Sequence, residues 1–230
     1  MALYGIGDLH LSSTGEKSMD VFEGWHNYRE RLKINWRNRV KDDDMVVIPG
    51  DFSWASSIED AVVDFAFINE LPGKKVIIKG NHDYWWSTAT KINGFLGNNS
   101  FTTINIINNN SITYNDVSIA GTRGWVLERD SIESMKVYLR ETNRLRLSLE
   151  DASGKKNKEI IAFLHYPPVY ANYRQTEIID LLKEFNIKRC YYGHVHGTSF
   201  KYSVNGERDG ITYKLISADY LKFSPHLIEN

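Results

Sequence analysis

The sequence is poor in residues that constrain a fold, with one cysteine and five prolines among 230 residues. A single cysteine cannot form an internal disulfide, so Cys190, which lies in an apolar stretch, is expected to be a small buried side chain. No run approaches the roughly 18 consecutive apolar residues of a membrane span. The first residues also lack the basic segment and apolar run of a signal peptide. We therefore expect a cytoplasmic protein with no membrane partner.

An excess of charge of one sign is also missing. The chain carries 28 basic and 29 acidic side chains, a formal charge of −1. This balance argues against a protein that binds nucleic acid through bulk charge and leaves a short oligonucleotide as the one nucleic-acid ligand to consider. A hydrophobic content of 42% is ordinary for a globular protein. The length is about one and a half times the ~150 residues of a typical domain, so residues 1–230 are expected to form a single domain. No obligate protein partner is evident.

The first half of the chain alternates apolar runs with helical patterns. Strands are expected over residues 2–7, 45–48 and 76–78. Amphipathic helices are expected over 18–40 and, from a capping box at Ser56 and Glu59, up to residue 68. Continuously apolar strands separated by helices favour an α/β fold with a partly parallel sheet covered on both faces.

The pattern changes after residue 100, where short apolar stretches alternate with asparagine-rich turns that suit antiparallel hairpins. The expected strands are 102–107, 111–114, 117–120, 160–164 and 187–192, and a late hairpin joins 200–204 to 211–216. The expected helices are 131–151 and 177–185.

Histidines concentrate just beyond the ends of these expected strands. Five of the seven lie there, together with three aspartates and an asparagine: His10, His82, His165, His194 and His196, with Asp8, Asp51, Asn81 and Asp83. In sheets covered by helices, functional groups gather beyond the carboxyl ends of the strands, because the loops there converge on one crevice. In extended backbone, residues two apart project to the same side, which applies to Asp8 with His10 and to His194 with His196. The glycines that precede Asp51 and Asn81 permit unusual backbone angles or close approach of another segment.

These residue types suit metal ions. Nitrogen and oxygen ligands without a thiolate favour Mn, Fe or Zn over Ca. The donors are too many for one tetrahedral ion, but they suffice for two ions roughly 3.5–4 Å apart that share Asp51 as a bridge. Asp8 or Asp51 alone is more often a turn or helix-cap residue. A purely structural explanation becomes improbable when all the strand ends are considered together.

The same residues form an ordered series of motifs: Asp8-x-His10, Gly50-Asp51, Gly80-Asn81-His82-Asp83, His165 and Gly193-His194-Val195-His196. This series resembles the calcineurin-like metallophosphoesterase superfamily and spans residues 8 to 196. The resemblance implies two packed mixed β-sheets flanked by helices. It also implies that a metal-bridging hydroxide attacks phosphorus and that His82 protonates the leaving oxygen. The implied metal ligands are Asp8, His10, Asp51 and His196 for one ion, and Asp51, Asn81, His165 and His194 for the other.

One departure bears on the substrate. The protein Ser/Thr phosphatases of this superfamily carry an Asp-Arg pair shortly after the Gly-Asp motif, whereas here Asp51 is followed by Phe-Ser-Trp-Ala. This argues against a protein phosphatase and leaves the orientation of His82 to Asp83 or another group. Arg123 and Arg174 lie in loops that could overhang the site and clamp a substrate phosphate, because a guanidinium matches its bidentate geometry. A surface salt bridge is the alternative for each.

The sequence therefore predicts a binuclear metal-dependent phosphoesterase that acts on small phosphomonoesters or phosphodiesters. A nuclease of the same superfamily is an alternative that the charge balance disfavours. A catalytically silent scaffold is a further alternative. The complete set of ligands, with His82 present, disfavours it.

Overall fold

The computed structural model describes residues 1–13, 18–126, 131–171 and 173–230, and its largest features are two mixed β-sheets. The first sheet has the strand order β13-β1-β2-β3-β4. Strands β1 to β4 run parallel and β13 is antiparallel to β1. The bounds are β1 (Leu3–Gly5), β2 (Met45–Pro49), β3 (Lys74–Ile78), β4 (Ile104–Ile107) and β13 (His226–Glu229).

The second sheet has the order β11-β12-β10-β7-β6-β5. Its four central strands are parallel and its two edge strands are antiparallel to their neighbours. The bounds are β5 (Ser111–Tyr114), β6 (Val117–Thr122), β7 (Glu159–Leu164), β10 (Arg189–Tyr192), β11 (Gly206–Arg208) and β12 (Ile211–Leu215). A small hairpin follows β7 and consists of β8 (Val169–Tyr170) and β9 (Tyr173–Arg174).

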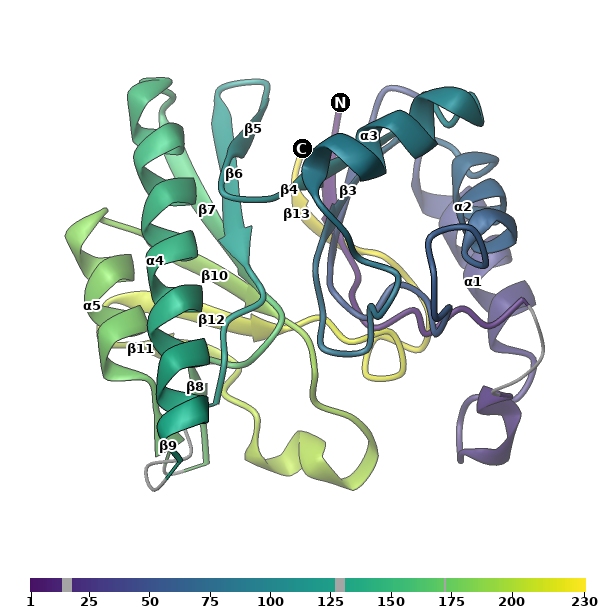
Figure 1. Cartoon of the computed structure of the whole chain (residues 1–230). Helices are drawn as coiled ribbons and strands as arrows, with labels where there is room; N and C mark the ends of the chain where they lie inside the picture. The colour runs from purple at the N-terminus through teal and green to yellow at the C-terminus, as the bar shows by residue number, and fades with distance from the viewer. Residues whose placement is uncertain (14–17, 127–130, 172) are drawn as a thin grey trace.

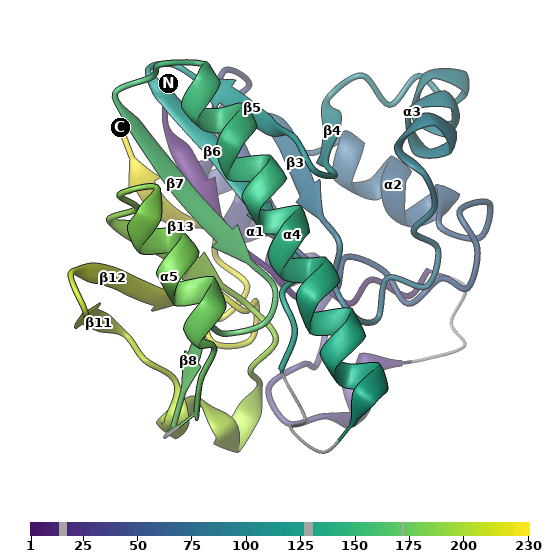
Figure 2. The ribbon, with the colours of Figure 1, turned by 60° about the vertical axis from the view of Figure 1, so that its left-hand side comes forward.

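The two sheets pack face to face through a shared apolar layer that includes Val47 and Ile78 from the first sheet and Ile119, Ile161 and Phe163 from the second. Helices cover the two outer faces (Figure 1; Figure 2). The first sheet carries α1 (Tyr28–Arg39), α2 (Val62–Asn69) and α3 (Ala89–Asn98), and the second carries α4 (Ile132–Gly154) and α5 (Thr176–Glu184). The expected fold class, two packed mixed sheets flanked by helices, is confirmed.

Several expected boundaries are wrong. The helix expected over 18–40 starts at Tyr28, and the segment before it contains only the short 3₁₀ helix η1 (Met19–Val21). The strand expected over 200–204 belongs to the 3₁₀ helix η2 (Gly197–Tyr202), and β12 pairs instead with β11. The capping box at Ser56 does not start a helix, because α2 begins at Val62. Both α3 and β13 were absent from the sequence-based expectation.

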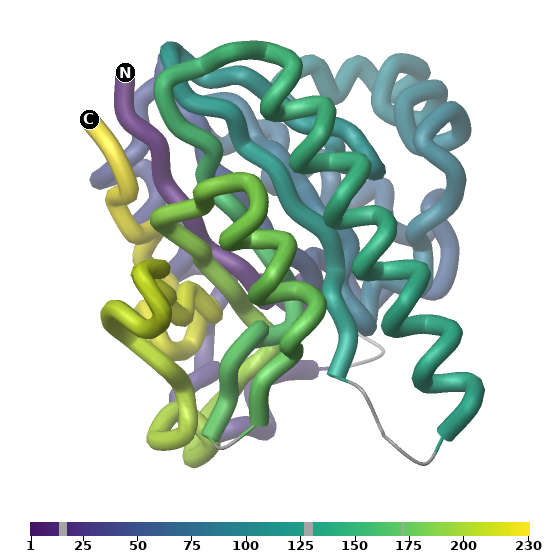
Figure 3. The backbone as a smooth tube through the Cα atoms, turned by 90° about the vertical axis from the view of Figure 1, so that its left-hand side faces the viewer, coloured from purple at the N-terminus to yellow at the C-terminus, as the bar shows by residue number. Residues whose placement is uncertain are grey.

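The fold brings the ends of its parallel strands to one side. The two chain termini lie next to each other at the opposite side, where Leu3 pairs with Glu229 (Figure 3). Beyond β1, the backbone joins the two sheets, since Gly7 donates to the Ile216 carbonyl at 2.8 Å. Among the helices of the described residues, none is both long and apolar enough to cross a bilayer.

Candidate metal centre

Loops at this end of the sandwich bring six of the sequence-predicted ligands into two groups. The first is Asp8, His10 and His196, and the second is Asp51, His165 and His194, each with its ligand atoms within 4.8 Å of one another. Asn81 joins the second group, because its Oδ1 lies 2.7 Å from His165 Nε2 and 3.0 Å from His194 Nδ1. Each group has the nitrogen and oxygen donors that suit a divalent transition-metal ion.

Four of these residues have backbone in the left-handed region: Asp8 (φ 57°), His10 (φ 45°), Asp51 (φ 50°) and His194 (φ 71°). Such a conformation costs a non-glycine residue on the order of 1–3 kcal/mol and persists only where the surroundings enforce it. At Asp8 and His10, hydrogen bonds between the segments after β1 and β2 enforce it, since Asp8 N donates to Gly50 O and His10 N to Asp51 O, both at 2.9 Å. The extended-backbone reasoning for Asp8 and His10 is therefore wrong, although both side chains reach the same group. It is also wrong for His194 and His196, because His194 is left-handed and the two side chains belong to different groups.

The glycines before Asp51 and Asn81 behave as expected, since Gly50 has an unusual backbone angle (φ 93°) and Gly80 permits close approach. Gly193, for which no expectation followed from the sequence, permits close approach as well. A Cβ built on Gly80 would lie 2.1 Å from the Asp51 backbone nitrogen. A Cβ on Gly193 would lie 2.4 Å from Asp8 Oδ2. Side chains at these positions would push the two carboxylates away from their present places, so the glycines are a steric requirement of the site.

Asp51 faces both groups with one oxygen. Its Oδ2 lies 3.5 Å from His165 Nε2 and 3.7 Å from His10 Nε2, while its Oδ1 accepts from the His82 backbone N–H at 2.7 Å. Burial, with the nearby charges of Asp83 and Asp8, raises the pKa of Asp51 well above its usual range. Among the described residues, no lysine or arginine forms an ion pair with Asp8, Asp51 or Asp83. A pair of cations would supply the compensating charge that these buried carboxylates need.

The second group presents lone pairs rather than protons to its centre. His165 Nδ1 lies 3.1 Å from the carbonyl oxygen of Pro49, which can only accept, so this nitrogen carries the proton and Nε2 is free to bind a cation. Burial lowers the pKa of His165 to about 3 and that of His194 to about 4, so both rings are neutral near pH 7. Neutral imidazoles beside a carboxylate and an amide oxygen are the protonation states that metal binding requires.

The first group includes a residue that the sequence analysis missed. Asp219 Oδ1 accepts from His196 Nδ1 at 2.9 Å, and its Oδ2 accepts from the Gly197 N–H at 3.2 Å. Burial lowers the pKa of His196, but the hydrogen bonds with Asp219 and Asp8 outweigh it and raise that pKa to about 10. A carboxylate behind a ligating histidine fixes the ring and increases its basicity toward a metal, and a cation binding at Nε2 would displace the proton there. Asp219 follows β12, so the strand-end rule applied above could have identified it.

The Asp83 carboxylate binds backbone N–H groups rather than the His82 ring that it was expected to orient. Its buried carboxylate accepts five hydrogen bonds, from the backbone N–H groups of Asp51, Phe52, Ser53 and Gly80 and from Trp85 Nε1, at 2.7 to 3.2 Å. Burial raises the pKa of Asp83 to about 6, with the hydrogen bonds acting in the opposite direction. The expectation that Asp83 orients His82 is therefore corrected: this carboxylate ties the loops after β2 and β3 together.

His82 lies beside both groups with its ring half-buried. The ring centroid is 4.3 Å from that of Trp54 and 5.7 Å from that of His10, and Nδ1 lies 3.4 Å from the Tyr84 hydroxyl. Trp54 also stacks on His10 at 5.0 Å, so one indole supports a metal-ligand candidate and the candidate acid. Sequence reasoning identified Trp54 only as part of a segment that lacks the Asp-Arg pair.

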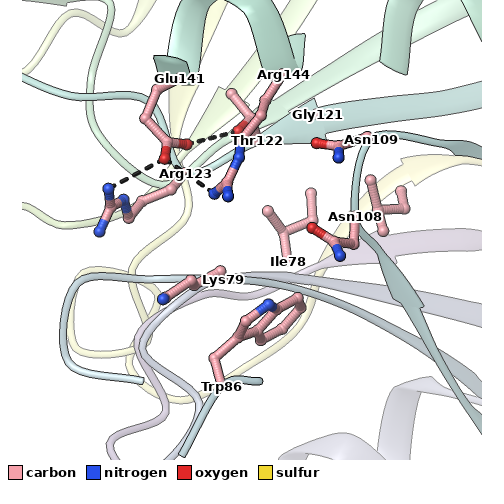
Figure 4. Close-up of a pocket in the computed structure, with 11 residues that line it drawn as sticks. Ile78, Lys79, Trp86, Asn108, Asn109, Gly121, Thr122, Arg123, Glu141 and Arg144 are labelled. Carbon is pink, nitrogen blue, oxygen red and sulfur yellow. Dashed lines mark hydrogen bonds and ion pairs between the residues drawn. The ribbon is translucent and has the colours of Figure 1, made fainter. Parts of the chain in front are cut away.

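The two candidate substrate arginines are placed differently. Arg123, at the end of β6, is 14% exposed, lies 3.1 Å from Glu141 and lines a groove that also contains Lys79 (Figure 4). Arg174 is an exposed residue of β9 whose guanidinium pairs with Asp209. Arg174 therefore forms a surface salt bridge, which was the alternative to its expected role as a phosphate clamp.

Comparisons with known proteins agree with this architecture. A phosphopantetheinyl hydrolase from Mycobacterium tuberculosis has a similar fold, with a TM-score of 0.59 at 12% identity over 99% of this chain and 95% of that one. A protein from Thermus thermophilus gives 0.57 at 12% identity, covering 99% and 97% of the chains. A protein of unknown function from Aquifex aeolicus gives 0.52 at 15%, covering 98% and 95%. No curated protein matches the sequence. The family model of the calcineurin-like phosphoesterases matches residues 1–198, and the chain belongs to that family.

Proposed function

We propose that the protein is a binuclear metal-dependent phosphoesterase that hydrolyses small phosphomonoesters or phosphodiesters. The observation that supports this best is the position of the Asp51 Oδ2 atom, which faces His10 of one ligand group and His165 of the other at 3.7 and 3.5 Å. A carboxylate oxygen placed between two groups of nitrogen and oxygen donors suits a bridge between two ions.

Each chain residue has a definite part in this proposal. Asp8, His10, Asp51 and His196 would hold one ion, and Asp51, Asn81, His165 and His194 the other; Mn, Fe or Zn suits these donors. When bound, two such ions lower the pKa of water toward neutrality and neutralise charge on a phosphoryl group. The carboxylates of Asp8 and Asp51 would offset only part of the positive charge of two divalent ions, so the site would still attract a phosphate ester.

His82 is proposed to donate a proton to the leaving oxygen. An imidazole has an ordinary pKa of about 6.5, which suits proton transfer near neutral pH. Its half-buried ring lies against His10 and Trp54 without belonging to either ligand group. Asp51 accepts from the His82 backbone N–H, so the same short segment positions the bridging carboxylate and the acid.

The proposal is tested by metal analysis together with hydrolysis of 4-nitrophenyl phosphate and bis(4-nitrophenyl) phosphate after reconstitution with Mn. Asp51→Asn should lose bound metal and nearly all turnover, because it removes the bridging charge. His82→Ala should retain its metal and lose most activity on esters with poor leaving groups, while His26→Ala, an exposed histidine outside the site, should behave as the wild type. Full activity in Asp51→Asn would refute the bridge, and metal loss in His82→Ala would refute the acid role.

The remaining expectations from the sequence stay predictions. They are a single domain over residues 1–230, a cytoplasmic location, a small phosphate-ester substrate and no obligate protein partner. A nuclease of the same superfamily would require hydrolysis of short oligonucleotides, which the same assay detects with a labelled oligomer. A silent scaffold would bind protein partners without turnover of either nitrophenyl ester.

A further inference from the structure

A groove opens close to the metal centre, between the ends of β3 and β4 on one sheet and β6 with α4 on the other (Figure 4). Its inner end, next to Arg123, has a volume of only about 20 Å³. Its outer part, which reaches the start of α3, has about 410 Å³, within the range of small-molecule sites. The residues that line both parts are Lys79, Trp86, Asn108, Asn109 and Arg144.

The groove shares its walls with the metal centre. Lys79 lies two residues before Asn81 in the loop after β3. The carbonyl of Arg123 accepts from the Tyr166 N–H at 2.8 Å, and the Tyr166 ring lies 4.1 Å from the ring of His194. Tyr166 thus contacts both the segment that follows β6 and a candidate ligand, so the groove and the second ligand group are neighbours in the fold.

The groove is rich in hydrogen-bond donors and positive charge. Arg123 and Arg144 both lie 3.1 Å from the same oxygen of Glu141, the one acidic residue among those that line the groove. Within the described part of the chain, the Lys79 ammonium has no hydrogen-bond or ion-pair partner, and the buried Arg123 Nε has no acceptor. Three cations and one carboxylate leave a formal charge of +2 that the protein itself does not neutralise.

A carboxylate ligand would offset one unit of the groove's charge, whereas a phosphate monoester carries about −1.5 to −2 near pH 7. Guanidinium donors also match phosphate oxygens in geometry.

We propose that this cationic groove binds a second phosphate of the substrate while the first reaches the metal centre, so that preferred substrates carry two separate phosphoryl groups. The inference rests on the proposed function, since the first phosphate of the substrate is the one hydrolysed at the metal centre. Lys79 and Arg144 contact the second phosphate, and the half-buried Trp86 ring packs against the part of the ligand between the two phosphates.

The test compares alkanediol bisphosphates of increasing length, from ethylene to octamethylene, with the alkyl monophosphates of equal length on the Mn-reconstituted enzyme. At a matching length the bisphosphate should have a kcat/KM about tenfold or more higher, well above the twofold expected from its two equivalent ends. Lys79→Met should abolish this preference, and Lys79→Arg should retain it. Lys91→Met, which removes an exposed lysine of α3 outside the groove, should leave it unchanged.

No preference beyond twofold at any length, or an equal preference in Lys79→Met, overturns the inference while leaving the proposed function intact. If the wild type hydrolyses neither series, the groove is judged by calorimetric titration of the chelator-treated full chain with pyrophosphate; the proposed function fails only if neither nitrophenyl ester is hydrolysed either. Binding by the wild type and Lys91→Met that is weakened about tenfold or more in Lys79→Met supports an anion site. No binding by the wild type, or equal binding by Lys79→Met, overturns it.

Discussion

Replacing Gly193 by alanine should disable the metal centre through one methyl group. The added Cβ would lie 2.4 Å from Asp8 Oδ2, whereas ordinary contact begins near 3.4 Å, so the carboxylate must move by about 1 Å. Asp8 is held by the His194 N–H at 2.9 and 3.1 Å and has no free space, since its side chain is fully buried. A misplacement of about 1 Å typically costs on the order of 10²-fold in rate.

The measurement is metal content per chain together with kcat/KM on a nitrophenyl ester. Gly193→Ala should bind less metal and lose activity about 100-fold, while its circular dichroism spectrum stays that of the wild type. Gly94→Ala is the matched control, because a Cβ there meets nothing within 4 Å and a helical glycine replaced by alanine gains stability. A Gly193→Ala protein with full metal content and wild-type kinetics would refute the steric argument.

Three further predictions concern the support of the site, its acid sensitivity and the core. Asp219→Asn should weaken metal affinity about 10- to 100-fold in a competitive chelator titration, because His196 loses its charged partner; unchanged affinity would contradict this. Chelator-treated protein should lose thermal stability as the pH falls from about 6.5 toward 4, because unfolding frees His165 and His194, whose pKa values are lowered in the fold, to take up protons, and this outweighs the opposite effect of the raised pKa values of Asp51 and Asp83; a flat melting temperature over this range would contradict it. Phe163→Ala, in the layer between the sheets, should lower the free energy of unfolding by about 3–5 kcal/mol in urea titration while metal binding is kept; a loss below about 1 kcal/mol would show that the layer is not tightly packed.

Some features followed from local sequence pattern alone. The apolar runs that became β2, β3 and β7 were identified because buried parallel strands are continuously apolar over a few residues. The helix expected over 18–40 was too long, because Phe22 and Trp25 keep the helical spacing although the chain before Tyr28 forms turns, in which Trp25 is buried and Phe22 is exposed. Helix α3 contains two glycines and two asparagines, which weaken the helical signal in the sequence, whereas in the fold the burial of Ile92 and Leu96 stabilises the helix.

The candidate site likewise has features that the local sequence predicted and features that it did not. Residue type and position after a strand identified seven candidate ligands, because imidazole and carboxylate chemistry is carried by the residue itself. The same reasoning misassigned Asp83, whose carboxylate binds four backbone N–H groups of two loops and the Trp85 indole. It did not separate Arg123 from Arg174, since both were expected in loops, and only the fold shows that Arg123 lines a groove while Arg174 pairs with Asp209.

By itself, therefore, the amino-acid order determined the fold class, the donor chemistry and the motifs that mark the family, since these depend on residue type and short-range periodicity. Tertiary structure alone decided that Asp219 lies behind His196 and that Lys79 and Arg144 line one groove. The reason is that these groupings join residues far apart in the chain. Their proximity arises from the packing of two sheets and from left-handed turns that no local pattern encodes.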